Sequence, residues 1–173
     1  DGGWAAQGTV NEGLLATFLA EGYFARPAPK STGRELFNQT WLDACLREYG
    51  THIEPQDVQA TLVALTARTI ATALCGSVPV ASRLIACGGG VHNRALIGAL
   101  AAALVDVSLE SPAEFSLDPA LVDAIAFAWL ARETLGGRPR HVPAGTRSSQ
   151  HLVRGRSYAG RHQAKRPRDT PTQ

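Results

Sequence analysis

The chain has 173 residues, of which 45% are hydrophobic and 18% are charged, and its formal net charge is +2. This composition is typical of a globular domain with a sizeable core, and it excludes a chain that is disordered throughout. No run reaches the roughly 18 apolar residues of a membrane span, and the first residues lack the basic start and apolar stretch of a signal peptide, so we expect a cytoplasmic protein without membrane contact.

The first part of the chain predicts a strand, two helices and a loop. Glycines flank an apolar and β-branched stretch at 2–11, which predicts a short strand, and Asn11 is expected to cap the helix that follows. Two prolines and small hydroxyl residues exclude regular structure at 26–34. A second helix is expected at 35–49, ended by Gly50.

A long helix and a strand–turn–helix unit are expected next. Pro55 suits a first helical turn, and apolar residues in two stripes at 58–74 imply a helix that is buried on two sides. Residues 83–87, "RLIAC", form an apolar run next to glycine, which is typical of a buried parallel strand. The glycines lead into a helix and then into a second short strand, "VDVSLE". Asp118 is expected to cap a last helix, which a glycine pair ends.

Strands that alternate with helices predict an α/β fold with a partly parallel sheet. We expect an ordered domain at 1–145. The remaining residues are different in charge, because 147–173 carry 7 Lys+Arg and 1 Asp+Glu while 1–146 carry 10 and 14. With one aromatic residue and no apolar period, the segment 146–173 is expected to be a basic, disordered tail rather than a nucleic-acid-binding element.

Several residue types point to the core rather than to a site. The cysteines include no CxxC pair and the histidines have no metal-ligand spacing, so we predict neither a disulfide framework nor a metal site. We expect these side chains in the core: Cys45, Cys75, Cys87, Trp4, Trp41 and Trp129. The chain contains no methionine and therefore no initiator, so we expect a piece of a longer protein.

The stretch "LIACGGGVHN" places Gly88, Gly89 and Gly90 between a strand and a helix, where free N–H groups and the helix dipole can hold an anion. A P-loop is excluded because no Gly-Lys-Ser/Thr follows. A dinucleotide turn needs a glycine where Asn93 stands, although Glu110 has the spacing of its ribose-binding acid. Two alternatives remain. One is a turn that resembles the adenosine side of the sugar kinase, Hsp70 and actin superfamily, with Asn93 as helix cap and ligand contact; the other is a tight turn with positive φ and no ligand.

Five stretches, taken in order, resemble the C-terminal half of the anhydro-N-acetylmuramic acid kinase family. They are "DGGWAAQGTVNEGLL", "YFARPAPKSTGRELFNQTWL", "DVQATLVALTARTI", "LIACGGGVHNRALIGAL" and "DAIAFAWLARETLGGRP". Together they cover nearly all of residues 1–145, and "FARPAPKSTGRE" and "CGGGVHN" are the most specific parts.

This resemblance implies the C-terminal lobe of an actin-like (ribonuclease H-like) ATPase, with a mixed sheet and packed helices. It implies transfer of the γ-phosphoryl group of ATP to the 6-oxygen of 1,6-anhydro-N-acetylmuramic acid, with water opening the anhydro ring. The product would be N-acetylmuramic acid 6-phosphate, an intermediate of peptidoglycan recycling. It also implies Mg²⁺ as cofactor, an N-terminal lobe as partner and typically a homodimer.

The resemblance also marks site residues. Those expected to contact the nucleotide are Gly88, Gly89, Gly90 and Asn93, and those expected on the substrate side are Asp123, Lys30, Ser31, Thr32 and Arg34. The residues alone leave two alternatives open, namely that Asp123 is a partly exposed residue of a first helical turn and that Ser31 or Thr32 caps the next helix.

The family's catalytic aspartate belongs to an Asp-Thr-Gly-Pro-Gly-Asn motif, which this sequence lacks. We therefore expect no catalytic residue and no metal ligand in this chain, and no activity from the chain alone. The alternative function is a non-catalytic lobe that keeps the fold and binds a partner but no ligand.

Overall fold

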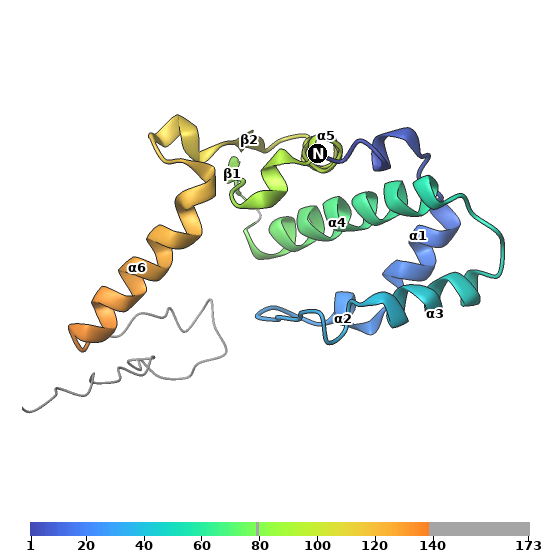
Figure 1. Ribbon diagram of the computed structural model, residues 1–173, viewed down its shortest axis with the longest axis horizontal. Helices are drawn as coiled ribbons and strands as arrows, with labels where there is room; N and C mark the ends of the chain where they lie inside the picture. Colours follow the sequence, from blue (N-terminus) through green and yellow to red (C-terminus); the bar gives the residue numbers. More distant parts are fainter. Residues whose placement is uncertain (79, 139–173) are drawn as a thin grey trace, which may run out of the picture.

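The computed structural model describes residues 1–78 and 80–138 (Figure 1). The 3₁₀-helices (η), α-helices and strands follow one another as η1 (Ala5–Gln7), α1 (Glu12–Leu19), α2 (Gly22–Ala25), α3 (Gln39–Tyr49), α4 (Pro55–Ser77), β1 (Arg83–Ile85), η2 (Gly89–His92), α5 (Arg94–Ala103), β2 (Ser108–Glu110), η3 (Pro112–Phe115), η4 (Pro119–Leu121) and α6 (Val122–Leu135). The long helix α4 lies in the middle, with α1 and α3 packed on one part of it and α5 on another.

The N-terminal segment is helical rather than extended, so the predicted strand at 2–11 is wrong. Trp4 has helical dihedral angles (φ −70°, ψ −46°), and η1 follows it directly. The segment is held against α4, because the Thr9 backbone N–H donates to the Asp57 carboxylate at 2.7 Å. Among the described residues only β1 and β2 pair as strands, so the backbone groups of this segment are satisfied by a tight turn and by α4 instead.

Asparagine side chains set the starts of α1 and α3. The Asn11 Oδ1 atom accepts from the Leu14 N–H at 2.9 Å, which confirms the predicted cap. Helix α3 begins later than predicted, because the Asn38 Oδ1 atom accepts from the Trp41 N–H at 3.1 Å and fixes the first turn there. Gly50, at φ 71°, ends α3 as predicted.

Helix α4 is packed on two sides, as the two apolar stripes predict. The first apolar cluster, with α1 and α3, contains the buried residues Leu14, Leu15, Phe18, Cys45, Val58, Ala64 and Leu65. The second apolar cluster, with α5 and the strands, contains the buried residues Ala67, Ala71, Leu100 and Leu104. By length and composition alone α4 could cross a membrane, with 23 residues and a mean hydropathy of 1.4. In this fold it is the shared wall of both clusters.

Thr61 joins α4 to the start of α1, and its replacement tests that contact. Its Oγ1 atom accepts from the Asn11 N–H at 3.0 Å and donates to the Asp57 carbonyl at 2.6 Å. Thr61→Val keeps the shape but leaves this N–H without an acceptor, so urea denaturation should show a loss of about 1–3 kcal/mol. The matched control is Thr66→Val, whose exposed hydroxyl only donates to the Leu62 carbonyl, and an equal loss in both variants would contradict this role.

The strands β1 and β2 form a two-stranded parallel sheet with the Cα partners Arg83–Ser108, Leu84–Leu109 and Ile85–Glu110. The parallel direction confirms the α/β expectation, and Leu84 and Leu109 pack against the second apolar cluster. The predicted full burial is wrong, because Ile85 is 46% exposed. No described element covers the outer face of the sheet, and no antiparallel strand makes it a mixed sheet within the described residues.

Helix α6 projects away from the other elements (Figure 1). The Asp118 Oδ1 atom accepts from the Ala120 N–H at 2.9 Å and so caps the short η4, and α6 starts after it, later than predicted. Among the described elements α6 packs chiefly against η4. Its exposed apolar side chains are Ile125, Phe127, Trp129 and Leu135.

The expectation that all cysteines and tryptophans are core residues is partly wrong. Cys45 is buried in the first apolar cluster, where burial raises the pKa of its thiol, and Trp41 packs against the same cluster. The exposed ones are Cys75, Cys87, Trp4 and Trp129. They lie on surfaces that no described residue covers. The predicted end of the domain at 145 and the basic tail at 146–173 lie outside the described residues.

Candidate functional site

The glycine turn, residues 88–93, connects β1 to α5. Gly88 has φ +79° and ψ −173°, a conformation that is nearly restricted to glycine. Its N–H donates to the Pro119 carbonyl at 3.3 Å, which ties the turn to η4. Of the three glycines only Gly88 has a positive φ, so a tight turn without a ligand explains this one glycine and not the other two.

Packing within the described chain does not explain Gly89 or Gly90. A Cβ atom at Gly89 would meet no heavy atom within 4 Å, and one at Gly90 would meet only the Leu96 Cδ2 atom at 3.9 Å. The surface of the turn is therefore open. An open glycine backbone at a helix N-terminus lets a ligand approach the N–H groups more closely than side chains would allow.

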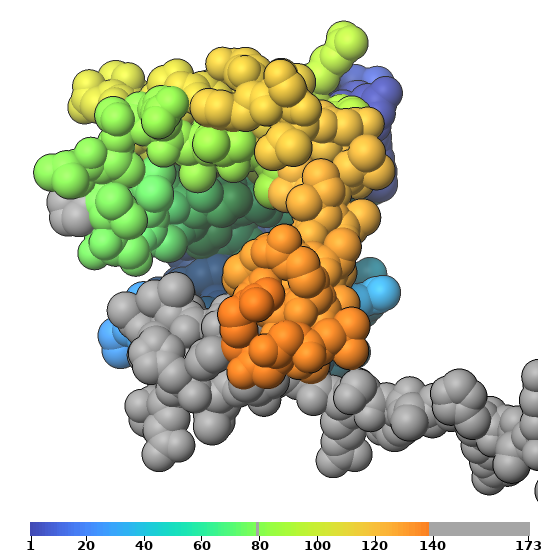
Figure 2. Space-filling view, turned by 90° about the vertical axis from the view of Figure 1, so that its left-hand side faces the viewer, coloured from blue at the N-terminus to red at the C-terminus, as the bar shows by residue number. Residues whose placement is uncertain are grey.

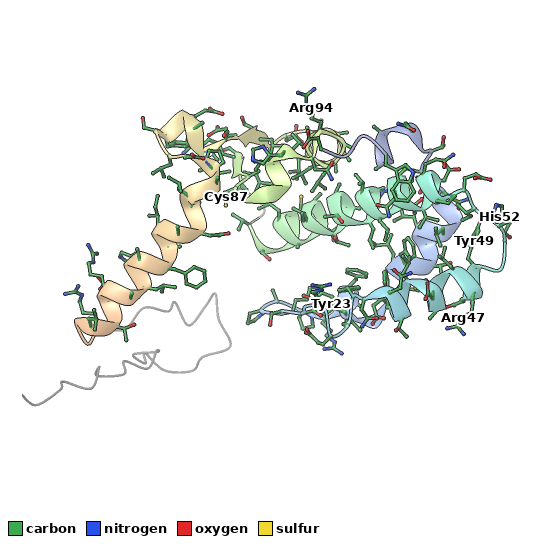
Figure 3. The ribbon with its side chains drawn as sticks, in the orientation of Figure 1. Tyr23, Arg47, Tyr49, His52, Cys87 and Arg94 are labelled. Atoms are coloured by element: carbon green, nitrogen blue, oxygen red, sulfur yellow. The ribbon has the colours of Figure 1, made fainter. Side chains whose placement is uncertain are left out.

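Asn93 begins α5 at the end of this turn. Its Oδ1 atom accepts from the Leu96 N–H at 3.1 Å, which confirms the predicted helix cap. Its Nδ2 atom has no partner among the described residues and is free to donate. The N-terminus lies alongside, since the Arg94 N–H donates to the Asp1 carbonyl at 3.2 Å and Gly2 lies against the Asn93 carboxamide. The Arg94 side chain points outward from α5 (Figure 3).

A cavity of about 490 Å³ opens beside the glycine turn. It lies between η2, α5, the end of β2 and the segment of η3 and η4, which Figure 2 shows in yellow and orange against the green of β1 and η2. Its apolar wall is formed by Val91, Ile97, Ala101, Leu109 and Pro119, and its polar lining by His92, Glu110, Ser111 and Glu114. An apolar wall with a few polar groups is typical of a small-molecule site.

Lys30, a predicted substrate-side residue, has partners within its own loop. Its Nζ atom donates to the Tyr23 carbonyl at 3.2 Å and to the Phe24 carbonyl at 2.7 Å, and it lies 5.0 Å from the centroid of the Tyr23 ring. These carbonyls belong to α2, whose free C-terminal groups favour a cation. In this chain Lys30 therefore stabilises the end of α2.

The other predicted residues of this loop are Ser31, Thr32 and Arg34, and all three are exposed. Asn38 caps the next helix, so the alternative that Ser31 or Thr32 caps it is wrong. The loop lies on the opposite side of α4 from the glycine turn (Figures 1 and 2). Within the described residues the two predicted sites are thus separate.

Asp123 is an exposed residue in the first turn of α6, where the helix dipole favours a carboxylate. Its helix starts next to the glycine turn, because η4 precedes it and is joined to Gly88. The structure therefore brings the start of Asp123's helix, but not the Lys30 loop, to the side of the glycine turn.

A model of the family described as "Anhydro-N-acetylmuramic acid kinase" matches residues 1–160. The chain belongs to the anhydro-N-acetylmuramic acid kinase family. Among curated relatives of this name, the one from Xanthomonas campestris pv. campestris (strain 8004) is 46% identical over 159 residues. That from Pseudomonas savastanoi pv. phaseolicola is 44% identical over 158 residues, and that from Shewanella sp. (strain MR-7) is 43% identical over 161.

These matches cover 91–93% of this chain but only 41–43% of each relative. The chain thus spans about two-fifths of the length of the relatives it matches. Membership of the anhydro-N-acetylmuramic acid kinase family confirms the resemblance in the sequence and argues against a dinucleotide-binding fold.

A kinase family implies the use of ATP and typically a divalent metal. Among the described residues no three His, Cys, Asp or Glu side chains come together as metal ligands. Mg²⁺ that arrives with a nucleotide needs one or two carboxylates besides phosphate oxygens. Of the two carboxylates at the cavity, Glu114 already accepts from the Ser111 N–H at 3.0 Å. The described residues thus form no evident Mg²⁺ site, and we derive no step through the ion.

Proposed function

We propose that this chain is the nucleotide-binding, C-terminal lobe of an actin-like kinase. The complete enzyme transfers the γ-phosphoryl group of ATP to the 6-oxygen of 1,6-anhydro-N-acetylmuramic acid while water opens the anhydro ring. The product is N-acetylmuramic acid 6-phosphate, in cytoplasmic recycling of peptidoglycan. The observation that carries the proposal is the open glycine turn at the N-terminus of α5, beside a cavity with an apolar wall.

Each part of this site has a task that its chemistry suits. The free N–H groups and the positive dipole end of α5 attract the phosphates, and the glycines let them approach the backbone. The Asn93 Nδ2 atom donates to a phosphate oxygen while Oδ1 keeps the helix cap. The apolar wall, with Val91 and Ile97, packs against the base.

The substrate-side residues are assigned on the family pattern. In the complete enzyme Asp123 would reach the sugar from the start of α6, and the loop with Lys30, Ser31, Thr32 and Arg34 would approach it from across α4. The exposed position of Asp123 and the exposed hydroxyls of the loop leave these side chains accessible to a ligand. No catalytic role is assigned to them.

Phosphoryl transfer with ring opening needs a base that activates water and groups that neutralise the transferring phosphate. We assign no such base to this chain, and we propose that the N-terminal lobe supplies it and that the complete protein is a homodimer. The exposed apolar side chains of α6 support a partner that covers this helix. Purified chain should therefore show no turnover of the sugar in a coupled ADP-release assay, and measurable turnover would contradict the proposal.

Asn93→Ala should weaken ATP binding to the purified chain more than tenfold, as measured by isothermal titration calorimetry. The reason is the loss of a hydrogen bond to a charged phosphate, which contributes about 1.5–3 kcal/mol. Asn93→Asp separates this effect from folding, because aspartate caps a helix as well as asparagine but repels a phosphate. Both variants should lose binding, while Asn93→Asp should keep the stability of the unaltered chain.

The matched control is Asn38→Ala, which removes an equivalent cap from α3. It should lower stability by about 1 kcal/mol and leave ATP binding unchanged. ATP binding that survives Asn93→Asp would contradict a phosphate site at this turn. An unaltered chain that binds no ATP would favour the alternative function, a non-catalytic lobe without a ligand.

A further inference from the structure

Glu110 stands at the end of β2 with its carboxylate at the cavity beside the glycine turn. Its backbone is fixed, because its Cα is paired with Ile85 across the sheet and its carbonyl accepts from the Ala86 N–H at 3.0 Å. The side chain is only 14% exposed. A carboxylate this far removed from water requires hydrogen-bond donors or a close counter-charge.

The described residues do not supply these donors. The nearest cation is Arg83, whose Nη1 atom is 3.7 Å from the Glu110 Oε2 atom, which is longer than a hydrogen bond. The Arg83 guanidinium lies 5.9 Å from the centroid of the Phe115 ring and its side chain is 60% exposed. Glu114, the other carboxylate at the cavity, is in contrast satisfied by the Ser111 N–H. Glu110 is thus the carboxylate at the cavity that lacks a hydrogen-bond donor among the described residues.

The chemistry of the cavity limits what can donate to Glu110. A carboxylate repels phosphate, so the phosphates of a nucleotide belong at the N–H groups of the glycine turn and not at this residue. The flat base suits the apolar wall, which offers it no hydrogen bonds. The part of a nucleotide that remains is the ribose, whose two neighbouring hydroxyl groups are uncharged donors that match the two oxygens of one carboxylate.

We propose that Glu110 accepts hydrogen bonds from the 2′- and 3′-hydroxyl groups of the bound nucleotide and thereby selects ribonucleotides over deoxyribonucleotides. This inference rests on the proposed function, because it needs ATP at the glycine turn. Removing either partner of such a bond leaves the other buried and unsatisfied, which is the reason that a hydrogen-bonding site discriminates strongly.

Calorimetric titrations of the full chain with ATP and with 2′-deoxy-ATP test this contact. The unaltered chain should bind ATP about tenfold more tightly than 2′-deoxy-ATP, as expected for one hydrogen bond to a charged group. Glu110→Gln should bind ATP about tenfold more weakly and bring the ratio of the two affinities close to one. The matched control, Glu114→Gln, should keep the ratio of the unaltered chain. Circular dichroism confirms that each variant is folded.

The possible outcomes distinguish the two proposals. Failure of the unaltered chain to bind ATP would overturn the proposed function and the ribose contact with it. Binding of ATP without ribose discrimination, or discrimination that persists in Glu110→Gln, would overturn the ribose contact alone. Purine riboside triphosphate, which lacks the 6-amino group, should bind as ATP does to both chains. If this analogue binds weakly to the unaltered chain and Glu110→Gln removes that difference, Glu110 contacts the base and the ribose assignment is wrong.

Discussion

Replacing Phe18 with alanine should lower the free energy of unfolding by about 3–5 kcal/mol. Phe18 is fully buried in the first apolar cluster, and its ring centroid lies 5.3 Å from that of Trp41. Truncation removes the ring that fills the space between α1, α3 and α4. Because these helices are also held by their caps and by Thr61, they cannot collapse fully into the cavity that remains.

Urea denaturation followed by far-ultraviolet circular dichroism measures this loss. The matched control is Leu19→Ala, the next residue of α1, which is 37% exposed and should cost less than about 1 kcal/mol. The glycine turn is on the side of α4 that carries the second apolar cluster, so ATP affinity of folded Phe18→Ala should equal that of the unaltered chain. Similar losses for both substitutions would show that the first apolar cluster does not form the core.

Gly2→Ala should destabilise the chain by about 2–3 kcal/mol and also weaken ATP binding. Gly2 has φ +81°, where a Cβ atom costs roughly 1–2 kcal/mol. The new Cβ would overlap the Asn93 Oδ1 atom and lie 2.9 Å from its Cγ atom. The Asn93 side chain must then leave the Leu96 N–H, with a further loss of about 1 kcal/mol for the cap.

Gly3→Ala is the control for this prediction, since a Cβ at Gly3 would meet no heavy atom within 4 Å. Thermal unfolding and calorimetric ATP titration of both variants provide the comparison. In the background of Asn93→Ala, the Gly2→Ala substitution should cost about 1 kcal/mol less, because the cap that it disturbs is already absent. Additive losses, or equal behaviour of Gly2→Ala and Gly3→Ala, would contradict the contact between Gly2 and Asn93.

Features that depend on a few neighbouring residues could be predicted from the sequence. Asn11 and Asn93 cap helices because a carboxamide reaches the N–H three residues ahead whatever surrounds it. Gly50 ends α3 because glycine has no Cβ to oppose a positive φ. The start of α3 was missed for a related reason, because Asn38 competes successfully with the earlier candidates Ser31 and Thr32.

Features that depend on a distant partner could not be predicted in this way. The stretch at 2–11 has the composition of a strand, but α4 offers its backbone the Asp57 carboxylate rather than a strand edge. Trp129 has the composition of a core residue, yet no described element packs on its face of α6. Burial and strand pairing are decided by what lies opposite a residue, and this is not written in its neighbours.

The candidate site shows the same division. The sequence alone identified the glycine turn, the cap at Asn93 and the family, since all three depend on the order of residues along one stretch. Only the tertiary structure showed that the ends of β1 and β2, η4 and the start of α6 meet around one cavity, and that the Lys30 loop lies across α4 from it. It also singled out Glu110, because whether a carboxylate lacks donors depends on the side chains that the fold brings within reach of it.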